Sequence, residues 1–222
     1  MLTLMEELLL LALNDEKGNL VSSATALPYG LNGAILLELA LAEKIDIDNK
    51  KLVVIAAPPT GNDLLDKALG ILAGAPKNKP VKYWVVRLSS AMKGLKNELL
   101  EKLIEKEILV EQENKILWVI PVKRYPAKNA APENAIRNRI RNIVLNGQTV
   151  DERSSLLISL IHACSLVNEI FEKDERRAAK KRIKEIGENE KVGKAITDTV
   201  NEAVMVAVSA AAIASVTTST ST

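Results

Sequence analysis

Lys93 and Lys96 are the side chains of this sequence best suited, by type and spacing, to bind a phosphate group. We predict that they share one turn of helix, where residues three apart lie on the same face and two ammonium groups could reach one anion. An apolar run follows downstream. Its members are Ile116, Leu117, Trp118, Val119 and Ile120. Cationic side chains beside an apolar finger are typical of proteins that bind reversibly to membrane surfaces.

The lysines and the apolar run would have to bind a membrane together, because neither alone contributes enough binding free energy. Each basic residue near an anionic surface contributes on the order of 1 kcal/mol. Burial of a large apolar side chain adds roughly 1.5–3 kcal/mol, and tryptophan favours the bilayer interface. From the residues alone, an alternative stays open: the lysines form a solvated helix face, and the finger packs on the core or on another subunit.

Composition limits the class of protein. The chain has 222 residues, 47% of them hydrophobic and 3% aromatic, which predicts one domain with an aliphatic core. The net charge of +2 is too small to indicate a nucleic-acid binder. The single cysteine excludes an intramolecular disulfide and fits a cytoplasmic protein. The single histidine argues against most zinc sites and histidine-based triads, so we expect no catalytic residue, metal or cofactor.

A helical body must position the lysines and carry the hairpin that holds the finger. We expect a mainly α fold, a single-domain helical bundle at residues 1–216 with short β-hairpins, one of them protruding and apolar. A disordered polar tail should follow at residues 217–222. The expected helices are residues 2–13, 31–43, 62–73, 95–106, 133–145, 151–172, 174–186 and 192–215. Thr3, with Glu6 three residues on, and Asn62 are the predicted N-caps.

Two segments are predicted as hairpins, each directly after a helix. Residues 45–55 alternate at period two around a turn, and residues 108–120 form a similar unit that ends in the apolar run. Residues 81–88 are ambiguous between helix and strand. The apolar stretch 203–216 is too short to span a bilayer, so any membrane role is expected to be peripheral.

Several ordered segments resemble the Golgi phosphoprotein 3 family. The opening LTLMEELLLLALNDEKG (2–18) is the closest match, and GLNGAILLELAL (30–41) and TGNDLLDKAL (60–69) continue the similarity. Shorter matches at 103–106, 161–164 and 178–183 extend it over nearly the whole chain. The resemblance implies a mostly helical fold with a protruding β-hairpin. It also implies a non-enzymatic, cytosolic peripheral protein that recognises phosphatidylinositol 4-phosphate on Golgi membranes and binds the cytosolic tails of glycosyltransferases.

The resemblance also assigns a lipid head-group site. The family pocket uses a tryptophan, an arginine and two later basic residues, which align here with Ser23, Asn32, Lys93 and Lys96. The basic pair is kept, whereas the arginine and the aromatic wall are absent, so head-group selectivity is expected to be looser. Gly33, beside Asn32, is expected to let backbone amides approach the anion, as is Gly30. The family hairpin aligns with residues 110–122.

Two other functions fit parts of the pattern. A helix followed by a hairpin superficially resembles a winged helix that binds nucleic acid, but the helix at 95–106 carries Glu98, Glu101 and Glu105, and we expect no nucleic-acid partner. Alternatively, the finger is an arm that joins copies of the chain into a homo-oligomer, which could coexist with lipid binding.

The basic run at 176–184 is bracketed by acidic residues and is typical of a solvated helix face.

Overall fold

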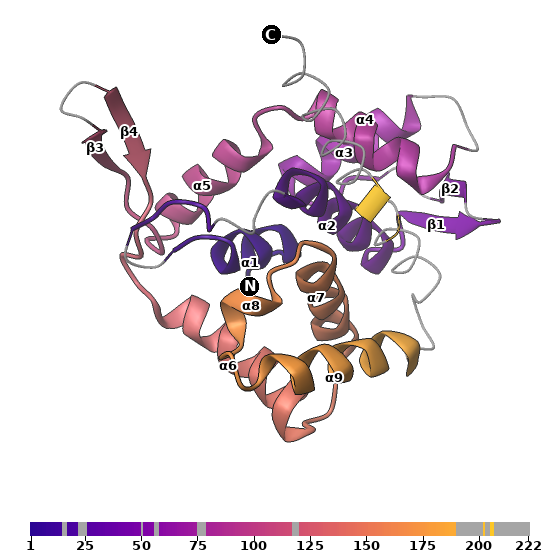
Figure 1. The fold of residues 1–222 in the computed structure, drawn as a ribbon. Coiled ribbons are helices and arrows are strands. Elements are labelled where there is room, and N and C mark those ends of the chain that lie inside the picture. The colour runs from indigo at the N-terminus through magenta and orange to yellow at the C-terminus, as the bar shows by residue number, and fades with distance from the viewer. Residues whose placement is uncertain are drawn as a thin grey trace, which may run out of the picture.

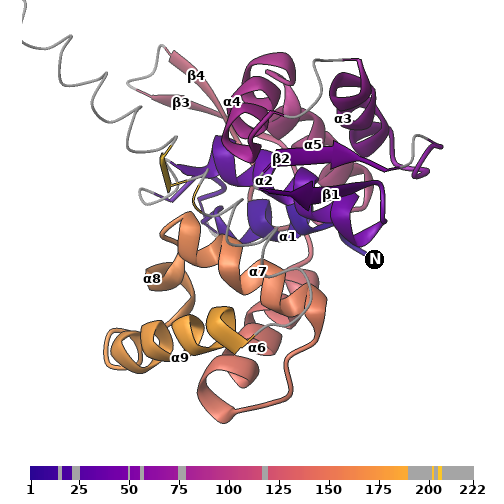
Figure 2. The same cartoon turned by 90° about the vertical axis from the view of Figure 1, so that its right-hand side faces the viewer.

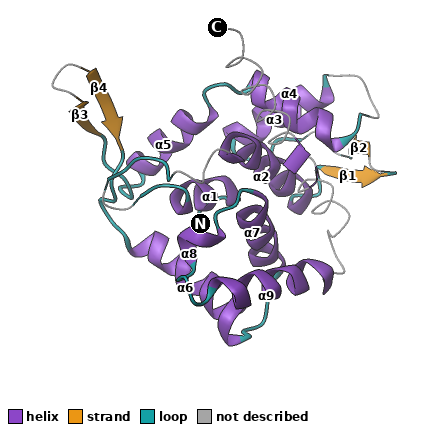
Figure 3. Cartoon of the chain, viewed as in Figure 1, coloured by secondary structure: helices purple, strands orange, loops and turns teal. Residues whose placement is uncertain are grey.

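The computed structural model describes residues 1–14, 17–21, 26–49, 51–55, 58–74, 79–116, 120–189, 202 and 205–206. Within these residues the chain is mainly α, with two separate antiparallel hairpins (Figure 1, Figure 3), which confirms the predicted fold class. The helices are α1 (Leu4–Leu11), α2 (Leu27–Leu41), α3 (Asp63–Ala73), α4 (Val81–Ala91), α5 (Leu95–Glu105), α6 (Ala131–Asn146), α7 (Glu152–Ala163), α8 (Val167–Ile170) and α9 (Arg176–Asn189). The expected polar tail lies outside the described residues.

α1 is the central helix of the bundle. All eight of its residues are buried, and it packs against α2, α5, α6 and α7. A helix whose residues are buried on every side must be surrounded by other elements. The predicted capping box at its start is present, because the Thr3 hydroxyl accepts from the Glu6 amide and the Glu6 carboxylate accepts from the Thr3 amide.

The remaining helices form two groups around α1 and α2. α3 and α4 pack on one side of α2, whereas α6, α7 and α9 pack together on the other side of α1. Both ribbon views place α4 and the second hairpin at one end of the molecule, with α6 and α9 at the opposite end (Figure 1, Figure 2).

Both predicted hairpins form, but the second lies at 112–124 rather than 108–120, so the apolar run is at its tip and not its second strand. β1 (Ile45–Asp48) pairs with β2 (Lys51–Val54), and β3 (Gln112–Ile116) pairs with β4 (Ile120–Arg124). The base of the second hairpin is held by the loop after α1, where the Tyr125 amide donates to the Gly18 carbonyl at 2.8 Å. Beyond this base the β3–β4 hairpin projects from the helical body (Figure 1).

The structure corrects two helix predictions and resolves one segment that was ambiguous. α2 begins at Leu27, earlier than expected, because Pro28 occupies its first turn, where a missing amide costs nothing. The segment 81–88 is helical, as part of α4. The single helix predicted for 151–172 is wrong: Ser165 has a φ of 60°, a left-handed conformation that separates α7 from α8. The helix predicted for 192–215 lies almost entirely outside the described residues.

Gly30 allows the closest approach between α2 and the end of α7. A Cβ at this position would overlap Cys164 Sγ and lie 3.3 Å from Leu8 Cδ2. We therefore expect Gly30→Ala to lower the free energy of unfolding by about 1–3 kcal/mol, as overpacking of a core does. Urea unfolding followed by circular dichroism would measure this change.

The matched control for this prediction is Gly70→Ala in the interior of α3, where a Cβ would meet nothing within 4 Å. It should raise stability by roughly 0.5–1 kcal/mol. Adding Cys164→Ala to Gly30→Ala removes the overlapping sulfur and should recover part of the loss. Equal stability of Gly30→Ala and the unaltered protein would contradict the packing described above.

Candidate functional site

Three of the four predicted head-group residues line one pocket. Asn32 comes from α2, Lys96 from the start of α5, and Lys93 from the turn that joins α4 to α5. The pocket has a volume of about 260 Å³. Its other lining residues are Leu20, Leu27, Pro28, Leu31, Ser89, Met92 and Leu95. The site therefore combines two cations with an otherwise largely apolar wall. Ser23 lies outside the described residues.

The two lysines do not share a helical turn, and that prediction was wrong. α4 ends at Ala91 and α5 begins at Leu95, so Lys93 lies in the intervening turn and Lys96 in the first turn of α5. Both side chains are exposed, and neither forms an ion pair with any residue that the structure describes. The turn still brings both cations to the same pocket.

The N-terminus of α5 adds a third positive feature to this pocket. Gly94 is its N-cap residue, and the helix has no side-chain cap. The Leu95 amide donates to the Met92 carbonyl at 3.0 Å, and the first turn also carries Glu98, so the positive end of the helix is partly satisfied. The N-terminal end of a helix carries a partial positive charge and favours anions. Leu95 and Lys96, the first two residues of α5, line the pocket, so the helix start and the lysine charges act at the same place.

Asn32 contributes an unused hydrogen-bond acceptor. Its side chain is only 3% exposed, and Nδ2 donates to the Pro28 carbonyl at 2.7 Å. Oδ1 accepts no hydrogen bond from any described residue. A buried acceptor without a donor costs about 1–3 kcal/mol. Oδ1 itself has almost no exposed surface, so a ligand hydroxyl would remove this penalty only if the pocket wall moved to expose it.

The glycines on either side of Asn32 do not have the predicted role. Gly33 lies inside α2, where its amide belongs to the helical hydrogen-bond ladder. The space beside Gly30 is filled by Cys164, whose thiol pKa is raised to about 12 by burial. Backbone amides of α2 are therefore not available to an anion at these two positions, and the lysines and the start of α5 are the positive groups of the pocket.

The apolar finger is described only at its edges. Ile116 is the last residue of β3 and Ile120 is the first residue of β4, and the two are partners in the strand register. Leu117, Trp118 and Val119 lie outside the described residues. The contacts that these five residues make therefore stay a prediction, although the hairpin that carries them projects from the body (Figure 1).

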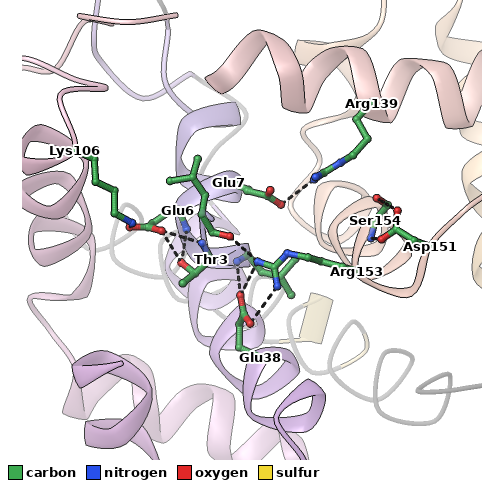
Figure 4. A network of polar contacts seen from close by, with 11 residues as sticks. Thr3, Glu6, Glu7, Glu38, Lys106, Arg139, Asp151, Arg153 and Ser154 are labelled. Carbon is green, nitrogen blue, oxygen red and sulfur yellow. Dashed lines mark hydrogen bonds and ion pairs between the residues drawn. The ribbon is translucent and has the colours of Figure 1, made fainter. Parts of the chain in front are cut away.

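A buried ionic network around α1 was missed by the sequence analysis (Figure 4). Lys106 pairs with Glu6, Arg139 Nη2 with Glu7 Oε2 at 3.0 Å, and Arg153 Nη2 with Glu38 Oε1 at 2.9 Å. Burial raises the pKa of Glu7, and the charge of Arg139 opposes that rise. The only available signal was two adjacent glutamates within an otherwise apolar helix, which require cationic partners once that helix is buried.

The network joins α1 to the helices around it. Arg153 bonds both oxygens of Glu38, and its Nη2 also donates to the Leu2 carbonyl at 2.8 Å. Glu38 Oε1 accepts from the Leu4 amide at 2.6 Å. These contacts connect α7, α2 and the first turn of α1. We assign this cluster to stability rather than to ligand binding.

None of the described helices has both the length and the apolar character needed to cross a bilayer. Among the described residues, His, Cys, Asp and Glu side chains form no group of three that could hold a metal ion. His162 is exposed whereas Cys164 is buried, so these two residues face different environments.

Taken together, the fold and the pocket define a helical protein with a cationic, partly apolar pocket and a hairpin that projects from the body. Residues 4–203 match the Golgi phosphoprotein 3 (GPP34) family, and the chain belongs to this family. It is also similar to vacuolar protein sorting-associated protein 74 of Eremothecium gossypii, with 27% identity over 165 residues. The match covers 65% of this chain and 49% of that relative, so the chain spans about half the relative's length.

Proposed function

We propose that this protein is a non-enzymatic, peripheral membrane adaptor that binds the head group of an anionic phospholipid in the pocket of Asn32, Lys93 and Lys96. The observation that carries the proposal is that two cations, neither paired with a described residue, and the start of α5 meet in one pocket with apolar walls. Membership of a family of Golgi-associated adaptors supports it.

Phosphatidylinositol 4-phosphate fits the chemistry of the pocket. Its phosphate would lie against Lys93 and Lys96, which supply point charges rather than the bidentate fork of arginine. An inositol hydroxyl would donate to Oδ1 of Asn32, the acceptor left unused by the described residues. Other anionic lipids with hydroxylated head groups meet the same requirements, and we expect them to bind as well.

Vesicle flotation tests this function directly. Three vesicle compositions are compared: phosphatidylcholine alone, phosphatidylcholine with phosphatidylserine, and phosphatidylcholine with phosphatidylinositol 4-phosphate. We expect the protein to float with both anionic vesicles, more strongly with the phosphoinositide, and to remain at the bottom of the gradient with the neutral ones. Failure to float with either anionic vesicle would rule out lipid binding.

The apolar finger is proposed to enter the bilayer interface. Trp118→Asp should then weaken binding to anionic vesicles by roughly tenfold or more, since burial of one large apolar side chain contributes about 1.5–3 kcal/mol. Flotation measures the loss, and light scattering measures the molecular mass. A fall in mass with unchanged flotation would instead identify the hairpin as an oligomerisation arm.

The adaptor role also implies protein clients. By family membership, we propose that the protein binds cytosolic tails of glycosyltransferases and retains these enzymes at the membrane, at the Golgi where the cell has one. Pull-down with immobilised tail peptides, in the presence and absence of anionic vesicles, tests this proposal. A protein that floats with vesicles but binds no tail would be a lipid-binding protein without this adaptor role.

A further inference from the structure

The outward face of α4 has the composition of a surface that contacts anionic lipid. Between residues 79 and 97 the chain carries five cations and no aspartate or glutamate. Two of them, Lys82 and Arg87, lie on α4 itself; Lys79 precedes the helix, and Lys93 and Lys96 are the lysines of the pocket. The next acidic residue, Glu98, pairs with Lys67 at 3.3 Å. Over this stretch of the chain the positive charge is not neutralised by neighbouring acidic residues.

Apolar and aromatic groups lie among the cations on α4. Val86 is 43% exposed, and Tyr83 is half-buried beside it on the same face. Both line a shallow depression of about 540 Å³ together with Lys82 and Arg87. Cations interleaved with interfacial aromatic and aliphatic side chains are the pattern of a helix that lies at a membrane surface.

Tyr83 is held in place by two of these cations. Lys79 Nζ lies 5.6 Å and Arg87 Cζ 6.0 Å from the centre of its ring, and Arg87 Nη1 is 3.2 Å from the hydroxyl oxygen. The edge of the neighbouring Trp84 ring supports it from the core side, with ring centres 5.2 Å apart. The tyrosine is thus a positioned aromatic group rather than a freely rotating one.

The α4 face adjoins the head-group pocket and shares its end of the molecule with the hairpin. Ser89 lines the pocket and Ser90, its neighbour on α4, lines the depression. Figures 1 and 2 both place α4 and the β3–β4 hairpin at the same end. A bilayer contact at both places requires that one surface touch the hairpin and the face of α4 together.

We propose that the outward face of α4 is a second membrane contact, and that its occupant is the surface of an anionic bilayer. Lys82 and Arg87 bind lipid phosphates there, while Tyr83 and Val86 lie at the level of the glycerol groups. This inference rests on the proposed function, because it requires that the pocket bring the protein to a bilayer. It adds an attachment that does not depend on which head group fills the pocket.

A fluorescent label tests this contact. Val86→Cys is labelled with an environment-sensitive dye; Cys164 is buried and does not compete for the reagent. We expect a blue shift of the emission on anionic vesicles and none on neutral ones. The matched control is Ala178→Cys on the exposed face of α9, at the opposite end of the molecule, which should show no shift.

A charge variant makes the test quantitative. Lys82→Gln with Arg87→Gln should weaken vesicle binding by roughly 25-fold, about fivefold for each cation lost. Its affinity for the soluble head group, inositol 1,4-bisphosphate, should not change. Arg177→Gln with Lys180→Gln on α9 is the control and should leave vesicle binding unaltered.

The outcomes separate this inference from the proposed function. If the unaltered protein floats with no anionic vesicle, the proposed function fails. If it floats, but the emission of the label at position 86 does not shift and the α4 variant binds vesicles as tightly as the unaltered protein, the inference alone is overturned. The face of α4 would then be assigned to a protein partner.

Discussion

Replacing both Lys93 and Lys96 by glutamate is expected to weaken binding to anionic vesicles by roughly 1,000-fold. Each cation near an anionic surface contributes on the order of 1 kcal/mol, and reversal converts the attraction into repulsion of similar size. Two reversals therefore change the binding free energy by about 4 kcal/mol, which is about a thousandfold in affinity. Titration of the protein with vesicles at low salt would measure the change.

The control for this variant has the same spacing on the opposite end of the molecule. Arg177 and Lys180 are three residues apart on α9 and exposed, as Lys93 and Lys96 are. Replacing them by glutamate changes the net charge of the protein equally but should leave vesicle binding within about threefold. Equal losses in the two variants would mean that net charge, not the pocket, attracts the protein to vesicles.

Arg153→Met is expected to lower the free energy of unfolding by about 3 kcal/mol. The side chains of Arg153 and Glu38 are 19% and 11% exposed, so removing the arginine leaves a largely buried carboxylate without its cation. Loss of one partner of a buried ion pair typically costs about 3–5 kcal/mol, and the partial exposure here favours the lower figure. Urea unfolding measures the difference.

Two further variants show whether the unpaired carboxylate causes the loss of stability in Arg153→Met. Arg153→Met combined with Glu38→Leu removes the unpaired carboxylate and should recover part of the stability, although the Leu4 amide loses its acceptor. Lys67→Met breaks the exposed pair with Glu98 and should cost less than about 1 kcal/mol. If Arg153→Met were as mild as Lys67→Met, the buried network would not stabilise the fold.

Local signals predicted much of the fold. Thr3 with Glu6, and Asn62, are caps that act within one turn, so their side chains alone set where α1 and α3 begin. The first hairpin was recognisable because period-two alternation and a turn lie within ten residues. In contrast, nothing local marks the end of α7 at Ala163, since the left-handed residue that follows, Ser165, is not a glycine.

The candidate site depended on contacts that the sequence does not encode locally. Asn32 joins Lys93 and Lys96 only because α2 packs against α4 and α5, and family resemblance was what placed these three residues together. The spacing argument for the two lysines assumed one continuous helix and failed at the turn after Ala91. The partners of Glu7 and Glu38 were unpredictable for the same reason, because they lie on α6 and α7, far along the chain.

The most direct measurement for the central claim is a crystal structure of the protein with inositol 1,4-bisphosphate. We predict phosphate density between the ammonium groups of Lys93 and Lys96 at the start of α5, with an inositol hydroxyl at Oδ1 of Asn32. A head group bound elsewhere on the protein, or an empty pocket at saturating ligand, would contradict the account.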